Sequence, residues 1–201
     1  MIKIIEIFGL GNAIDSMDVC TDTNVNQKEH MLRLIGGSYN AYHKSIFEHM
    51  IVHYEIKASI KLVSQINRHK HIAISQQSTR YALRKMIAKG LQLYETGSIR
   101  ADTAGAIAIK NISSYEHVAN DDLSYCLTLG TITKARYTQT FHDFCMMIIR
   151  RSDKRAMKEA REFARECIEE IKKHDTVDWG DEQIYHPIFE KIRALYEKEI
   201  I

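Results

Sequence analysis

The chain contains little cysteine, a single proline and no excess of charge of either sign. Its four cysteines, Cys20, Cys126, Cys145 and Cys167, lack C-x-x-C spacing, which argues against a zinc ribbon or a redox pair and favours buried free thiols. With 28 basic and 26 acidic residues, nucleic-acid binding would require a local basic patch. The apolar stretch 2–8 is too short for a signal sequence or a membrane span. These absences predict a soluble, cytoplasmic protein with no membrane or nucleic-acid partner.

The 201 residues, of which 45% are hydrophobic, suffice for one core, and no shift in composition marks a second domain. We therefore expect one domain over residues 1–201. Alternation and β-branched residues predict strands at 2–8, 50–57 and 131–139. We expect helices at 26–35, 58–68, 81–95, 99–111 and 141–151. Apolar spacing of three and four predicts the strongest helix at 153–173, and a last helix opens at Pro187. The expected fold class is α+β, in which a central antiparallel or mixed sheet packs with several helices.

Three sequence patterns that often carry chemistry are incomplete here. The first strand is followed by Gly9 and Gly11, but Ile14 stands where a dinucleotide-binding loop has its third glycine, so we expect a structural turn. The ten histidines include no H-E-x-x-H motif, so no metal site is predicted. Ser78 is not part of a G-x-S-x-G elbow, so we do not expect it to be a nucleophile.

The segment RHKHIAISQQSTRY, residues 68–81, concentrates basic and hydrogen-bonding side chains. We expect Gln65 and Arg68 to share a helix face, followed by a loop that carries Gln76, Ser78 and Arg80. Guanidinium groups bind phosphate bidentately, hydroxyls and amides complete such a shell, and amides can read the edge of a pyrimidine. This chemistry suits a small anionic nucleotide, and a solvated basic loop is the alternative.

The same segment resembles the signature of the flavin-dependent thymidylate synthases, R-H-R followed by seven residues and a serine. HKSIFEHMIVHYEIK (43–57) is similar to the family's H-x-S-x-x-E-H segment and the strand after it. NDDLSYCLT (120–128) and RSDKRAMKEAREFA (151–164) resemble weaker landmarks further along. Several landmarks in the correct order make the resemblance specific, and it covers the chain from about residue 42 onward.

The resemblance implies a homotetrameric α+β enzyme that methylates C5 of deoxyuridine monophosphate (dUMP) without an enzyme nucleophile. It implies FAD as cofactor, NADPH as reductant and methylenetetrahydrofolate as one-carbon donor. By position, the residues that hold dUMP would be Gln65, Arg68, Gln76, Ser78, Arg80 and Arg151. Those that contact the flavin would be His43, Ser45, Glu48, His69 and Lys70. Arg80 and Arg151 would serve catalysis by stabilising negative charge on the pyrimidine ring.

This sequence departs from the family at several positions. Lys70 replaces the third signature arginine, so a planar fork becomes a point charge. Substitutions relative to the family also occur at Gln76, Ser124, Leu127-Thr128, Thr140 and His142, where the last two replace a flavin-binding asparagine and arginine. Two alternatives to an active synthase therefore stay open. One is a non-flavin relative that binds a pyrimidine nucleotide or modifies its C5 differently. The other is a structural protein whose basic loop meets RNA, for which only Tyr81 offers a nearby stacking ring.

Overall fold

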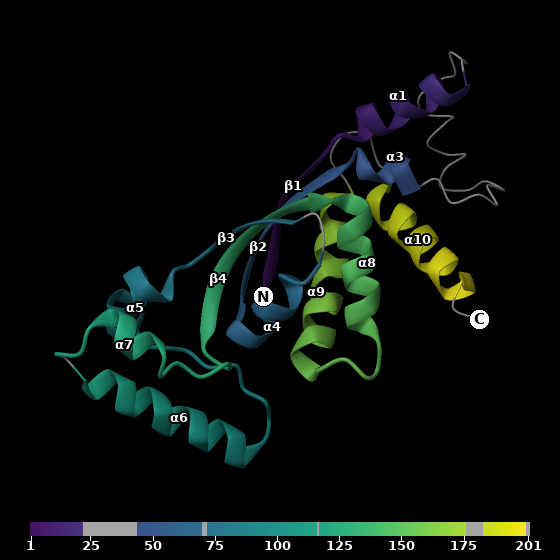
Figure 1. The fold of residues 1–201 in the computed structure, drawn as a ribbon. Coiled ribbons are helices and arrows are strands. Elements are labelled where there is room, and N and C mark those ends of the chain that lie inside the picture. The colour runs from purple at the N-terminus through teal and green to yellow at the C-terminus, as the bar shows by residue number, and fades with distance from the viewer. Residues whose placement is uncertain (22–43, 70–71, 116, 176–182, 200–201) are drawn as a thin grey trace. The chain divides into compact units, whose positions relative to one another are not determined.

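The computed structural model describes residues 1–21, 44–69, 72–115, 117–175 and 183–199. Four strands of this part of the chain form one sheet in the order β1-β2-β4-β3 (Figure 1). Their bounds are Ile2–Phe8 for β1, Ile51–Ser59 for β2, Ile72–Gln76 for β3 and Ile132–Thr140 for β4. The predicted α+β class and the three predicted strands are confirmed. Strand β3 was not predicted, because its four last residues are exposed and it lacks apolar alternation.

The described chain divides into two compact units. The first contains Met1 and residues 56–68 and 74–136, and the second contains residues 2–55, 69–73 and 137–201.

The second unit has a core of large apolar side chains. Helices α8 (Phe141–Ser152) and α9 (Lys158–His174) pack against each other, and α10 (Tyr185–Glu199) contacts both (Figure 1). Tyr54 of β2 stacks on Tyr137 of β4 with ring centroids 5.1 Å apart, and its ring lies 4.9 Å from that of Phe144. All three side chains are fully buried. The helix predicted at 141–151 is confirmed as α8, and its apolar face enters this core.

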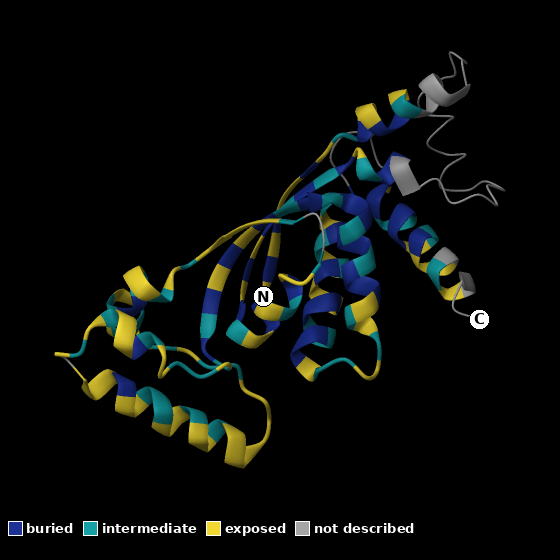
Figure 2. Cartoon of the chain, in the orientation of Figure 1, coloured by how far each residue is buried: buried dark blue, intermediate teal, exposed yellow. Residues whose placement is uncertain are grey.

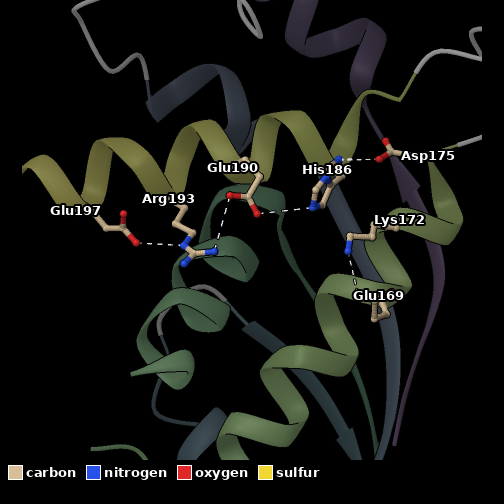
Figure 3. Close-up of polar contacts among 7 residues, drawn as sticks. All are labelled: Glu169, Lys172, Asp175, His186, Glu190, Arg193 and Glu197. Carbon is tan, nitrogen blue, oxygen red and sulfur yellow. Dashed lines mark hydrogen bonds and ion pairs between the residues drawn. The ribbon is translucent and has the colours of Figure 1, made fainter. Parts of the chain in front are cut away.

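A buried carboxylate joins the end of α9 to the start of α10. Asp175 is 3% exposed, and it accepts hydrogen bonds from the backbone N–H groups of Ile184 at 2.6 Å, of Tyr185, and of His186 at 2.9 Å. Figure 3 shows Asp175 beside His186 at the beginning of α10. Because the first N–H groups of a helix have no partner within the helix, Asp175 supplies the acceptors that α10 needs.

Charged side chains continue along the solvent side of α10. His186 Nε2 lies 3.6 Å from Glu190 Oε1, and Arg193 Nε donates to Glu197 Oε1 at 3.1 Å (Figure 3). Exposed ion pairs at a spacing of four residues, such as Arg193 with Glu197, each stabilise a helix by only about 0.3–0.5 kcal/mol. The packing of α10 against α8 and α9 therefore contributes more to its stability than these ion pairs do.

The turn after β1 partly follows the prediction. Gly9 has φ +86°, and a Cβ atom there would lie 2.3 Å from the carbonyl oxygen of His49, so only glycine fits. Gly11 was predicted to belong to the same turn, which is wrong. It lies within helix α1 (Leu10–Thr21), where a Cβ atom would meet nothing within 4 Å.

The first unit has a much smaller core. Besides α4 (Ile60–Ile66), its helices are α5 (Thr79–Ala88), α6 (Ile99–Ser114) and α7 (Asn120–Ser124). Each of these last three contributes one buried residue, Leu83, Ile112 and Leu123, to a common cluster. Most of α6 is exposed or only partly buried (Figure 2).

Several predicted helix boundaries are wrong. The helix predicted over 81–95 ends at Ala88, because Gly90 adopts φ +78° and stops it. The helix predicted from 153 begins at Lys158, because the Asp153 carboxylate accepts the Arg155 backbone N–H at 2.8 Å and forms a turn. The helix predicted over 58–68 spans only Ile60–Ile66. The helix predicted at 26–35 lies outside the described residues.

No described helix is both long and apolar enough to cross a membrane. Among the cysteines, Cys145 and Cys167 are buried free thiols as predicted, whereas Cys126 is exposed. Burial raises the pKa of the Cys145 and Cys167 thiols, so both stay protonated at neutral pH.

Candidate nucleotide site

Ser78 and Arg80 lie at the start of helix α5, in the first unit. Ser78 is the N-cap residue, with φ −69° and ψ 122°, and its side-chain oxygen accepts the Tyr81 backbone N–H at 3.3 Å. The loop predicted here is therefore wrong, since a strand and a helix start occupy it. The helix N-terminus brings unpaired N–H groups and a partial positive charge, both of which favour a phosphate. The Ser78 hydroxyl still has its own hydrogen to donate to a ligand.

The Arg80 guanidinium is held by the carboxylate of Asp121, which was not predicted from the sequence. Arg80 Nε lies 2.8 Å from Asp121 Oδ1 of α7, and both side chains are at least half exposed. The guanidinium carbon also lies 5.6 Å from the centroid of the Tyr81 ring. Within the described residues no hydrogen bond involves the two terminal nitrogens of Arg80, which leaves them available for a phosphate. The only sequence signal for this pair is the acidic run Asp121-Asp122, whose partner lies 41 positions earlier in the chain.

The remaining predicted nucleotide residues of the first unit are Gln65, Arg68 and Gln76. Gln65 is partly buried in α4, but that helix ends at Ile66, so Arg68 lies in the turn beyond it. The prediction that Gln65 and Arg68 share a helix face is therefore wrong. Gln76 is the exposed last residue of β3. Arg68 is exposed as well, and among the described residues its guanidinium makes no hydrogen bond or ion pair.

Arg151 and His69 meet in the second unit. Arg151 is in the last turn of α8, and its Nη2 atom lies 3.2 Å from Nε2 of His69. Both side chains are partly buried. Arg150 precedes Arg151 and is exposed, so two positive charges end this helix, where they complement its dipole. The structure thus joins one residue predicted to hold dUMP with one predicted to contact the flavin.

Burial and positive charge keep His69 neutral. Desolvation, then the charges of Arg151 and Arg150, lower the pKa of His69 from 6.5 to about 4, against a smaller opposing effect of Asp143. At neutral pH the imidazole therefore carries no charge and can accept one hydrogen bond while donating another.

The residues predicted to contact the flavin are only partly described. His43 and Lys70 lie outside the described residues, and the side chain of Ser45 does so too, although its backbone belongs to α3 (Lys44–Glu48). Glu48, the last residue of that helix, is partly buried. The flavin contacts of His43, Ser45, Glu48 and Lys70 therefore stay predictions.

Thr140 and His142, at positions where the family has flavin-binding residues, have structural surroundings in this chain. The Thr140 hydroxyl caps α8 by accepting the Asp143 backbone N–H at 3.1 Å. His142 is 4% exposed, and its Nδ1 atom lies 3.3 Å from Asp143 Oδ1. Thr140 therefore serves as the N-cap of α8, as the N-cap preference of threonine predicts, while His142 is buried in its first turn.

No group of three or more histidine, cysteine, aspartate or glutamate side chains suited to a metal occurs in the described part of the chain.

The fold defined by this sheet and these helices is shared with solved structures. Two crystal structures of thymidylate synthase X from Helicobacter pylori, both described with FAD and dUMP, superimpose with TM-scores of 0.78 and 0.79. They are 17% and 18% identical to this chain, cover 96% and 95% of it, and are themselves covered to 99% and 98%. The similarity therefore establishes the α+β fold over nearly the whole length.

Sequence comparison identifies the family. The model for thymidylate synthase complementing protein matches residues 11–175, and the chain belongs to that family. Curated relatives include flavin-dependent thymidylate synthases from two Helicobacter pylori strains. One is 24% identical over 168 residues, or 75% of this chain and 79% of the relative, and the other is 26% identical over 141 residues, or 61% and 68%. The resemblance inferred from the signature segment is thus confirmed.

Proposed function

We propose that this protein is a flavin-dependent thymidylate synthase, which methylates C5 of dUMP and releases dTMP. The observation that carries the proposal is the family match over residues 11–175. The predicted nucleotide residues are consistent with it, because Ser78 and Arg80 begin a helix and Arg151 lies in the last turn of another. The helix N-terminus offers N–H donors and partial positive charge, and the arginine side chains offer charged donors, both of which an anionic nucleotide requires.

The chain's own residues would act on the nucleotide mainly by electrostatics. Arg68 and Arg80 offer guanidinium groups to the phosphate, and Ser78 adds a hydroxyl and the helix N-terminus. Gln65 and Gln76 offer amides that can pair with the pyrimidine edge. Arg151 would stabilise negative charge that develops on the ring when hydride is delivered, as fixed donors do in an oxyanion hole. No side-chain nucleophile is needed for this role, and none is proposed.

The chemistry of His69 and Arg151 suits the binding of an anionic aromatic cofactor. A neutral imidazole beside the guanidinium of Arg151 provides a flat ring, a hydrogen-bond donor and adjacent positive charge. We propose that His69, with Glu48, His43, Ser45 and Lys70, holds FAD. When bound, the flavin supplies the hydride chemistry that no amino-acid side chain offers.

The remaining components of the reaction belong to the same proposal. NADPH would supply the reducing equivalents and methylenetetrahydrofolate the methylene group, which is reduced to the C5 methyl group of dTMP while tetrahydrofolate is released. We propose a homotetramer. The compartment we propose is the cytoplasm, where free thiols such as Cys145 and Cys167 stay reduced.

A second function is favoured by one specific observation. Thr140 caps α8 and His142 is buried beside Asp143, at positions where the resemblance implies a flavin-binding asparagine and arginine. A relative that keeps the nucleotide residues but has lost the flavin would show these substitutions. Such a protein would bind a pyrimidine nucleotide, or modify its C5 by another reaction.

The visible absorption spectrum of the purified protein separates the two functions. Titration with FAD should give bound oxidised flavin, and a shift of its absorption bands on adding dUMP would indicate that the two ligands bind in one site. A protein that binds dUMP in calorimetry but does not retain FAD would instead support the second function. Failure to bind either ligand would contradict both.

A further inference from the structure

The contact between Arg151 and His69 determines where the imidazole carries its proton. A guanidinium group has only donors, so Arg151 Nη2 must donate to His69 Nε2 across the 3.2 Å that separate them. A neutral imidazole has one N–H, and with Nε2 accepting, that hydrogen must be on Nδ1. This assignment follows from donor and acceptor chemistry alone.

We propose that His69 is a positioning residue whose Nε2 lone pair fixes the direction of the Arg151 guanidinium toward an anionic pyrimidine nucleotide, and that Arg151 in turn holds His69 in the Nδ1–H tautomer. The inference rests on the proposed function for its ligand. The histidine–arginine linkage itself rests on the described contact. It assigns His69 a second role beside the flavin contact predicted from the signature.

The charges around His69 keep this arrangement intact near neutral pH. Burial disfavours a second proton on the ring most strongly, the charges of Arg151 and Arg150 disfavour it further, and Asp143 favours it. A protonated ring could only donate, and it would repel Arg151 instead of accepting from it. The contact is therefore present above about pH 4 and is lost below it.

The tautomer also determines what His69 offers to a ligand. Its Nδ1–H is a donor, and among the described residues no partner accepts from it. A carbonyl or phosphate oxygen of a bound ligand would satisfy this donor, whereas a ligand N–H would not. The His69 ring thus orients the guanidinium of Arg151 through Nε2 and offers its own Nδ1–H donor to a ligand.

Two substitutions at position 69 test whether dUMP binding requires a hydrogen-bond acceptor at the place of Nε2 or the imidazole ring itself. In His69→Gln the amide oxygen can reach the place of Nε2 and accept from Arg151. In His69→Asn the shorter side chain places its oxygen nearer the position of Nδ1. We expect dUMP affinity, measured by calorimetry without flavin, to fall about tenfold in His69→Asn and to stay within about threefold of the original chain in His69→Gln. Equal affinities for the two variants would overturn the positioning role.

Nitrogen-15 chemical shifts of the imidazole test the linkage without any ligand. At neutral pH the original chain should show His69 as the Nδ1–H tautomer. Arg151→Ala should allow the Nε2–H tautomer to appear, while Arg150→Ala, which removes a neighbouring charge but not the hydrogen bond, should leave the tautomer unchanged. An Nε2–H ring in the original chain, or equal effects of the two alanine variants, would overturn the proposal. If the original chain does not bind dUMP, the proposed function fails, and these spectra still decide whether Arg151 governs His69.

Discussion

The two arginines proposed to stabilise charge on the nucleotide are held in contrasting ways. Arg151 ends a helix with seven buried residues, is itself partly buried, and is paired with a neutral histidine. Arg80 begins a helix with one buried residue, is 64% exposed at its side chain, and is paired with a carboxylate that is half exposed. The first arginine is fixed by packing before any ligand arrives, and the second is held by an ion pair that solvent and salt screen.

The largest expected difference is in the free energy of unfolding, between substitutions in the core that α8 enters and in the cluster that α5 enters. Phe144→Ala should lower the free energy of unfolding by about 4 kcal/mol, because it removes a fully buried ring packed against Tyr54. Leu83→Ala should lower it by about 2 kcal/mol, at the low end for such a change, since the partly exposed residues around its cluster can relax. Urea unfolding followed by circular dichroism measures both. Equal losses would contradict the contrast between the two cores.

A second test compares the two aspartates. Asp175→Ala leaves three backbone N–H groups at the start of α10 without their acceptor in a buried place, so we expect a loss of about 3 kcal/mol. Asp121→Ala breaks an exposed ion pair, and we expect a change in stability of less than about 1 kcal/mol. Thermal unfolding at matched salt concentration compares them directly. A comparable loss in Asp121→Ala would mean that the Arg80 pair is much better shielded than its exposure indicates.

A third test uses dUMP affinity. Arg151→Ala should weaken binding by about 3 kcal/mol and Arg80→Ala by about 1.5 kcal/mol, the upper and lower ends for a hydrogen bond to a charged group. The reason is that Arg151 is partly desolvated and oriented, while Arg80 must be ordered on binding. Asp121→Asn, which keeps the size of the side chain, is the control for Arg80. An unchanged affinity in Arg80→Ala would exclude Arg80 from the site.

The same contrast explains which features could be predicted from sequence. The strands 2–8, 50–57 and 131–139 were predictable because burial imposes alternation, and the core of α8 because burial imposes a helical period. Strand β3 is exposed and short, so it leaves no such pattern. Its formation depends on hydrogen bonds to β4, which is distant in sequence, so no local sequence pattern indicates it.

The site shows a similar division. The resemblance supplied Arg80 and Arg151 as candidates, since Arg80 closely follows the signature serine and Arg151 opens the downstream landmark 151–164. It supplied neither of their partners, Asp121 and the Nε2 atom of His69, because each pair joins segments far apart in the chain: 41 positions for Arg80 and Asp121, 82 for Arg151 and His69. Family motifs therefore identify which residues meet a ligand, while tertiary structure determines how each is held.

The smallest expected effect is the acid sensitivity of the histidine pair. The folded-state pKa of His69, about 4, lies below its ordinary value of 6.5, so the unfolded chain binds more protons between these values. Stability linked to His69 is therefore fully present above pH 6.5 and is lost as pH falls toward 4. The effect is smaller than the preceding ones because His69 is only partly buried and solvent screens it. Urea midpoints across this range should fall less steeply in His69→Gln, which cannot titrate, and His53→Gln is the control for losing an imidazole. Parallel slopes for the original chain and His69→Gln would show that folding does not depress the pKa of His69.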